Sequence, residues 1–238
     1  MKLFSKISAL GAVLVLSTAF ASADTIQLGS YATGTSNLGN ANSAINYAGF
    51  QAIPQPAPSP LPGFLPQNGT ANSYFLDPSS VWSPAVPNST WVGFAPTAGP
   101  VGTSNPNYGY YTFTTTFTAT GVYSGFIDVL ADDTTWVLLN GVPIVTIGAL
   151  GSDQHCADNV PTCLTQDVVS LSGLNLSGTN MLTFIVQQQG TGPVGATGDP
   201  SGFDFDAQLT STPEPSTLLL LGTGLMGSAG ALFRRKRA

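Results

Sequence analysis

Residues 111–118, with the sequence YTFTTTFT, decide the fold class of this 238-residue chain. Aromatic and threonine side chains alternate along them with a period of two, which is typical of a β-strand. We therefore expect a half-buried strand whose aromatic side chains face a core and whose threonines face outward.

The same alternation recurs through much of the chain and predicts an all-β domain. Asn140-Gly141 separates two of the alternating segments, and both residues tolerate the positive φ that a type I′ hairpin turn requires. Many short strands separated by turn residues favour an antiparallel β-sandwich. The further strands are expected at residues 123–130, 134–139, 142–147, 182–188 and 203–209. A proline-rich stretch at residues 53–66 is expected to form a loop inside a domain spanning residues 24–211.

The charges are distributed very unevenly. Residues 7–233 contain no lysine or arginine, whereas they hold all eleven aspartates and the single glutamate. Such a domain lacks the cations that neutralise phosphate, which excludes nucleic-acid binding. Its field attracts cations instead.

Residues 1–23 have the organisation of a signal peptide. Basic Lys2 and Lys6 precede an apolar stretch at residues 7–20, and the small residues Ala21 and Ala23 follow it. We expect a signal helix that signal peptidase removes after Ala23. The apolar stretch is shorter than the roughly 20 residues that a membrane span needs.

The C-terminal region, residues 212–238, has three parts in a fixed order. Pro213-Glu214-Pro215 comes first, and its prolines keep the chain extended. An uncharged apolar run at residues 216–233 predicts a transmembrane helix. The four cations that end the chain should stay on the cytoplasmic side; they are Arg234, Arg235, Lys236 and Arg237.

Together, this motif, apolar run and basic end resemble the PEP-CTERM sorting signal. The resemblance covers the last 27 residues. It implies recognition by an exosortase-type membrane protease and cleavage near residues 213–215. It also implies a transient inner-membrane anchor, followed by release to the cell surface or extracellular matrix of a bacterium with a Gram-negative-type envelope.

A second resemblance concerns the exported domain. Residues 110–117, Ala131-Asp132-Asp133 and residues 137–141 look like parts of exported galactose-binding-like jelly-roll modules. The resemblance covers about residues 73–210. It implies that ligands bind in loops at one end of the sandwich, and that a structural calcium ion is common.

Cys156 and Cys163 lie in one polar loop of an exported chain, so we expect a disulfide between them. The alternative is a metal site in which the two thiolates act with His155, helped by Asp153 and Asp158.

Two pairs of aspartates are candidate sites. Asp132 and Asp133 precede a strand and can supply oxygen ligands to calcium, or they can form a solvated turn. Asp204 and Asp206 alternate with phenylalanines, so their carboxylates are expected on an exposed acidic face.

Aromatic side chains offer a candidate glycan site. Trp82 and Trp91 lie in proline- and serine-rich segments, where they can stack on sugars or pack in a core. Trp136 lies in an apolar strand and is expected in the core. Tyr108 and Tyr110 are further candidates for a stacking platform.

No enzyme motif stands out. The chain has no G-x-S-x-G, P-loop or H-E-x-x-H sequence, and it contains one histidine. We therefore expect a non-enzymatic structural or adhesive role. A carbohydrate-binding module is the alternative, and a secreted glycoside hydrolase that uses two aspartates is a remote one.

The two terminal signals predict the ends of the mature protein. Protein recovered from the culture medium should begin at Asp24 and end near residues 213–215, and its intact mass should show both cuts. A released form that retains residues 218–233 would contradict removal of the sorting tail.

Overall fold

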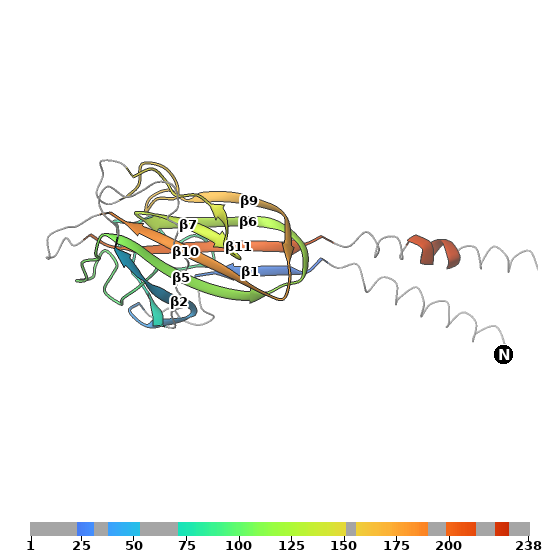
Figure 1. Cartoon of the computed structure of the whole chain (residues 1–238), viewed down its shortest axis with the longest axis horizontal. Helices are drawn as coiled ribbons and strands as arrows, with labels where there is room; N and C mark the ends of the chain where they lie inside the picture. The colour runs from blue at the N-terminus through green and yellow to red at the C-terminus, as the bar shows by residue number, and fades with distance from the viewer. Residues whose placement is uncertain are drawn as a thin grey trace, which may run out of the picture. The chain divides into compact units, whose positions relative to one another are not determined.

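A computed structural model of the chain describes residues 23–30, 38–52, 71–150, 156–189, 199–212 and 222–228 (Figure 1). The chain divides into two units, residues 26–209 and the two terminal segments 1–25 and 210–238. The predicted proline-rich loop at 53–66 lies outside the described residues, as do residues 1–22 and 229–238.

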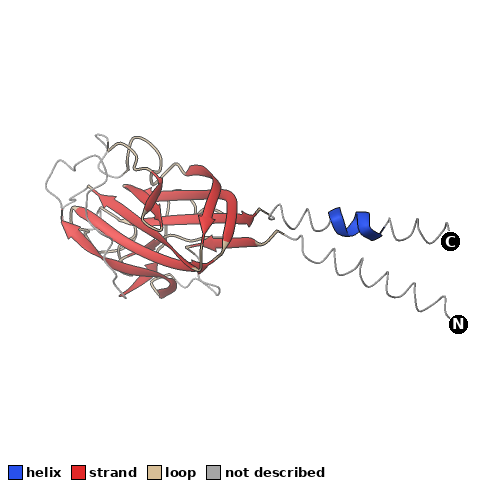
Figure 2. Ribbon diagram, turned by 45° about the vertical axis from the view of Figure 1, so that its right-hand side comes forward, coloured by secondary structure: helices blue, strands red, loops and turns tan. Residues whose placement is uncertain are grey.

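The unit of residues 26–209 is built from β-strands, as the alternation predicted (Figure 2). In the described residues, eleven strands form one sheet: ten follow the order β8-β7-β10-β5-β2-β3-β4-β11-β6-β9, and β1 pairs with β11. Their bounds are β1 Thr25–Gly29, β2 Ala41–Ala52, β3 Ala71–Phe75, β4 Val92–Gly93, β5 Gly109–Thr118, β6 Gly121–Asp132, β7 Thr134–Leu139, β8 Val142–Val145, β9 Asp167–Leu176, β10 Thr179–Gln188 and β11 Gly202–Ser211.

The sheet folds over on itself and is nearly closed. Its first and last strands, β8 and β9, come close to each other, and the long pairings β10–β5, β2–β5 and β6–β9 are antiparallel. Phenylalanine rings pack between the two layers of the folded sheet. The ring centroid of Phe203 on β11 lies 4.8 Å from that of Phe113 on β5 and 4.6 Å from that of Phe184 on β10. An antiparallel all-β fold is therefore confirmed. The finer jelly-roll, galactose-binding-like assignment stays a prediction.

The hairpin predicted at Asn140-Gly141 is present. Asn140 has φ 50° and Gly141 has φ 82°, and Leu139 on β7 pairs with Val142 on β8. Strand β8 ends at Val145, two residues earlier than expected.

The strand at residues 111–118 is buried more deeply than the alternation predicted. Thr112 and Thr114 are buried although they point away from the main core, whereas Thr116 is exposed. A second apolar cluster explains this difference. It covers the outer face of β5, β10 and β7, and it comprises Tyr110, Trp136, Leu138 and Ile185. The prediction that Trp136 belongs to a core is confirmed.

Two of the strands, β2 and β9, were not expected from the sequence. Strand β2 has a sequence rich in alanine, asparagine and glycine, yet it lies between β5 and β3. Strand β9 forms the edge of the sheet beside β6. Pairing with β3 and β5, rather than intrinsic β-propensity, places β2 inside the sheet.

In the terminal unit, the described parts of the two chain ends pair with each other. The Asp24 N–H donates to Ser211 Oγ and the Ser211 N–H donates to the Asp24 carbonyl, each over 2.7 Å. A short helix covers residues 222–228. Within the described residues, no helix has both the length and the apolar character that a membrane crossing requires. Most of the predicted signal and transmembrane segments lie outside those residues.

Candidate functional site

One end of the sandwich gathers most of the residues that the sequence singled out. Strand β6 ends there at Asp132, β10 ends at Gln188, and β11 begins at Gly202. The loops that follow β3 and β8 come to the same end. We call this region the loop end.

Asp132 and Asp133 join β6 to β7 at the loop end, and both side chains are 0% exposed. Trp82 Nε1 donates to Asp132 Oδ2 over 2.5 Å, and the Gln189 N–H donates to Asp133 Oδ2 over 2.5 Å. The peptide bond between the two aspartates is cis. The alternative of a solvated turn is therefore wrong, because both carboxylates are buried and each accepts a hydrogen bond from the protein.

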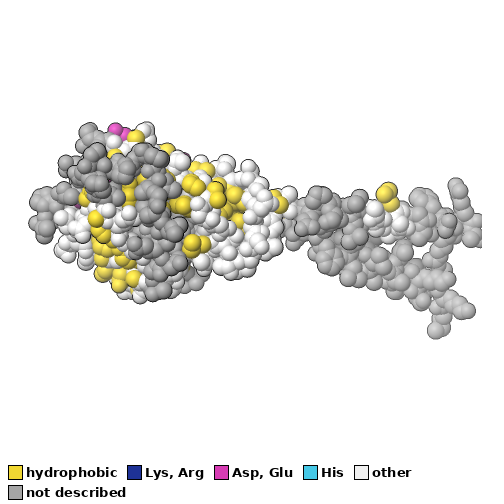
Figure 3. All heavy atoms as spheres, viewed as in Figure 1, with side chains coloured by type: hydrophobic (Ala, Val, Ile, Leu, Met, Phe, Trp, Pro, Cys, Tyr) yellow, Lys and Arg dark blue, Asp and Glu magenta, His cyan; other side chains and the backbone are white. Residues whose placement is uncertain are grey.

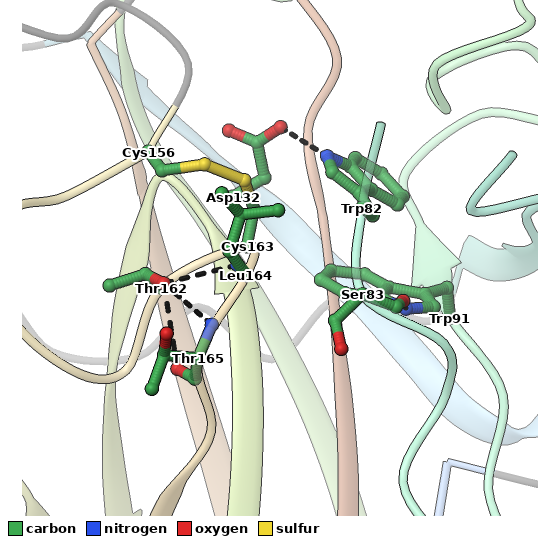
Figure 4. Close-up of a disulfide and its surroundings, with 9 residues drawn as sticks. All are labelled: Trp82, Ser83, Trp91, Asp132, Cys156, Thr162, Cys163, Leu164 and Thr165. Carbon is green, nitrogen blue, oxygen red and sulfur yellow. Dashed lines mark hydrogen bonds between the residues drawn. A yellow bond between two sulfur atoms is a disulfide. The ribbon is translucent and has the colours of Figure 1, made fainter. Parts of the chain in front are cut away.

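The predicted disulfide between Cys156 and Cys163 is confirmed, which rules out the metal site in which these thiolates act as ligands. Figure 4 shows the carboxylate of Asp132 beside the disulfide and Trp82. The Ala131 N–H donates to the Thr162 carbonyl over 3.1 Å, and the Ser83 N–H donates to the Cys163 carbonyl over 2.9 Å. The disulfide loop thus ties β6 to the segment after β3. His155 and Asp153 lie outside the described residues.

Trp82 and Trp91 do not form an exposed platform, which corrects their assignment as a glycan-stacking pair. Trp82 is 3% exposed and Trp91 is 0% exposed. Their rings stack on each other with centroids 4.2 Å apart, and Trp91 Nε1 donates to the Ser83 carbonyl. The segment at residues 76–91 folds over the outer face of β6, where both rings belong to one buried apolar cluster with Leu130. Tyr110 is also buried.

Asp204 and Asp206 are buried as well, so the predicted exposed acidic face is wrong. Asp204 accepts hydrogen bonds from Ser30 Oγ over 2.6 Å and from the Val86 N–H over 2.7 Å. Asp206 accepts one from Gln27 Nε2. Strand β1 and the segment at residues 76–91 supply these donors, because they cover the face on which both carboxylates lie.

Asp128 on β6 shares this buried face. Its Oδ1 atom accepts no hydrogen bond within the described part of the chain. Burial, together with the nearby carboxylates of Asp204 and Asp206, raises the pKa of Asp128 to about 6. Burial also raises the pKa of Asp204 and of Asp206. No metal-holding group of three or more His, Cys, Asp or Glu residues exists among the described residues.

A groove of about 370 Å³ opens on the disulfide loop. Its lining combines polar and apolar side chains and carries one exposed carboxylate, that of Asp158. The lining residues are Cys156, Ala157, Asp158, Asn159, Val160, Thr162, Leu164 and Thr165. Such a groove can receive a small neutral ligand through hydroxyl and amide hydrogen bonds.

Residues 211–237, at the C-terminal end of the chain, match the PEP-CTERM protein-sorting motif. The chain carries a PEP-CTERM sorting signal. It is thus an exported protein with a membrane-associated sorting signal at its C-terminus, which an exosortase-type protease processes. The PEP-CTERM residues Pro213, Glu214 and Pro215 and the basic residues 234–237 lie outside the described residues, as does Ala21; Ala23 is described and exposed.

Solved structures with some similarity to this chain have TM-scores well below 0.5. A β-glucosidase from Kluyveromyces marxianus in complex with glucose is 13% identical, with a TM-score of 0.32, and the match covers 70% of this chain and 16% of that one. A GH26-CBM35 β-(1,4)-mannanase from Podospora anserina is 18% identical, with a TM-score of 0.25, covering 48% of this chain and 25% of that one. The chain spans a quarter or less of the length of these proteins. A search of curated proteins found no match.

The pKa of Asp128 predicts that acid stabilises the fold. Because the folded-state pKa of about 6 exceeds the ordinary 3.8, its contribution to folding is complete below pH 3.8 and is lost as the pH rises through about 6. Replacing Asp128 by Asn should raise the melting temperature at neutral pH and flatten its decline between about pH 4 and pH 7.

Thermal melts across this range measure the effect. The exposed carboxyl of Asp158 provides the matched control, since Asp158→Asn should leave the slope unchanged. A wild-type slope in Asp128→Asn would show that Asp128 does not cause the pH dependence.

Proposed function

We propose that this chain is an exported cell-surface or extracellular-matrix protein with a non-enzymatic structural or adhesive role, and that its loop end makes the contacts. A signal peptide exports it, the C-terminal segment holds it in the inner membrane, and an exosortase-type protease then releases it. The observation that carries the proposal is the construction of the loop end. There one disulfide and two buried aspartates hold together segments that lie far apart in the sequence.

The use of the carboxylates supports a non-enzymatic role. Asp132, Asp133 and Asp204 each accept hydrogen bonds from the chain's own backbone or side chains. A glycosidase needs two carboxylates that flank a substrate cleft. Here the aspartates of β6 and β11 lie beneath β1 and the segment at residues 76–91, and they hold these covering segments in place.

Calcium fits the chemistry of the loop end. Asp132 and Asp133 present adjacent carboxylates, and oxygen ligands of this kind suit Ca²⁺. Residues 7–233 contain no lysine or arginine that can compete for them. Two carboxylates supply only part of the six to eight oxygens that Ca²⁺ takes, so backbone carbonyls or side-chain amides must complete the set.

A carbohydrate-binding module is the second candidate, and the groove on the disulfide loop favours it. Asn159, Thr162 and Thr165 contribute neutral polar groups to this groove. The Ala157 N–H donates to the Asp133 carbonyl, so the groove is coupled directly to the proposed calcium site. Bound calcium would therefore stiffen the groove wall.

The calcium proposal predicts a change in stability. At a free Ca²⁺ concentration of 100 times the dissociation constant, the folded state gains about 2.7 kcal/mol, which raises the melting temperature of a domain of this size by roughly 5 to 10 °C. Melts of the released protein in chelator and in Ca²⁺ measure this gain.

Two controls separate a site from general charge screening. NaCl of matched ionic strength should not reproduce the gain, and the Asp132→Asn, Asp133→Asn double variant should lose it. If the wild type gains nothing specific from Ca²⁺, these aspartates do not hold calcium.

An array of immobilised glycans, probed with the released protein in Ca²⁺ and in chelator, tests whether the loop end binds glycans. Calcium-dependent binding that Asn159→Ala abolishes would support the carbohydrate-binding candidate. Ser177→Ala, at the opposite end of the sandwich, is the matched control and should bind as the wild type does. Binding that is equal in both variants would exclude the groove as the glycan site.

A further inference from the structure

Strand β9 is a free edge of the sheet. Figure 1 shows it at the upper margin of the domain, and within the described residues it pairs only with β6. Its first five residues, 167–171, pair with residues 125–129 of β6 without interruption, and the register shifts only beyond them. We call residues 167–171 the edge segment. A regular edge of this kind offers its outward N–H and C=O groups to a further strand.

The other edge of the sheet, β8, is protected against such pairing. Strand β8 has four residues, contains Pro143 and pairs with β7 across a bulge. It also lies beside the last part of β9, because Val142 and Ile144 share a groove of about 250 Å³ with residues 173–176. The edge segment contains no proline, lysine or bulge. It therefore lacks the features with which proteins usually protect an exposed edge.

The side chains of the edge segment suit pairing with an identical segment. Val168 is 55% exposed and Ser170 is also exposed, whereas Val169 and Leu171 face the main core. Directly opposite residues of paired strands share a face of the sheet. An antiparallel pair centred on Val169 therefore places Val168 opposite Ser170 of the second copy, and Val169 opposite its own equivalent. Outward and inward residues of both copies then stay on the same sides.

Charge limits where two copies of this chain can meet. Residues 7–233 carry acidic side chains and no lysine or arginine, so two copies repel each other wherever carboxylates approach. In the antiparallel pair, the two copies of Asp167 are offset by four residues, or about 14 Å, and the two copies of Asp128 lie at least three strand spacings apart, again about 14 Å. Both distances exceed the Debye length of about 8 Å at physiological salt. In Figure 3, the surface along β9 is hydrophobic or neutral, and the visible acidic atoms lie away from it.

We propose that two copies of this chain join through their β9 edges, by antiparallel pairing of the two edge segments about a two-fold axis at Val169. The partner of the edge is a second copy of the chain, and one sheet continues through both domains.

This pairing decides where the two loop ends point. Strand β9 begins near the loop end, since Asp167 pairs with Val129, three residues before Asp132. Antiparallel pairing therefore directs the two loop ends away from each other. A dimer of this kind can bridge two ligands, a use that rests on the proposed structural or adhesive role.

The molar mass of the released protein tests the pairing, measured by sedimentation equilibrium over a series of concentrations. The wild type should change from one copy to two as the concentration rises. The Val168→Lys, Ser170→Lys variant places like charges opposite each other, so it should keep the mass of one copy. The Val168→Lys, Ser170→Glu variant places lysine opposite glutamate at both positions, so it should recover the dimer.

Val142→Lys is the matched control. Val142 is 64% exposed on β8, the protected edge, so its replacement should leave the dimer unchanged. A wild type that keeps the mass of one copy at every concentration would overturn the proposal. The same conclusion follows if the double-lysine variant dimerises as the wild type does, or if the opposite-charge variant fails to recover the dimer.

Binding to the glycan array separates this proposal from the adhesive role. Glycan binding by a wild type that keeps the mass of one copy overturns only the self-pairing. A dimer that binds no glycan on the array refutes only adhesion to glycans. The double-lysine variant should bind the array with the affinity of a single loop end, since its substitutions lie on β9 and not at the groove.

Discussion

The absence of any cationic side chain between residues 7 and 233 is the constraint on which this structure depends. A buried carboxylate is costly unless it is paired, and here no lysine or arginine is present to pair with it. Neutral donors must do so instead, namely indole, hydroxyl, amide and backbone N–H groups. Asp132 and Asp204 each receive such donors from the segment at residues 76–91. The aspartates therefore attach the covering segments to the sheet.

This use of aspartate explains how the described segments of the loop end are held together although many of them are irregular. Trp82 packs on Trp91 and donates to Asp132, while the disulfide loop bonds both to the segment at residues 76–91 and to β6. Packing, hydrogen bonding and a covalent link thus act on the same few residues. A rigid scaffold that positions loops in this way is typical of binding proteins.

The two ends of the domain are built differently. The loop end carries carboxylates, a groove and the disulfide, whereas three uncharged turns joined by Asn180 form the other end. The chain enters and leaves the larger unit through β1 and β11, which pair with each other.

The sequence by itself determined the all-β class, the Asn140-Gly141 hairpin, the disulfide and the sorting signal, because each depends on local pattern or on residue type. Alternation, turn chemistry and the order of short motifs are all properties of neighbouring residues. Predictions from such properties do not depend on what covers either face of the sheet.

Only the tertiary structure decided which polar and aromatic side chains are buried. Asp204 and Asp206 alternate like outward-facing residues, and they do point away from the main core, but β1 and the segment at residues 76–91 cover that face. The same covering segment buries Trp82 and Trp91, and pairing with β5 places the weakly β-forming strand β2 inside the sheet. A period of two shows which side of a strand a residue occupies, but contacts between residues far apart in the sequence decide whether that side meets water.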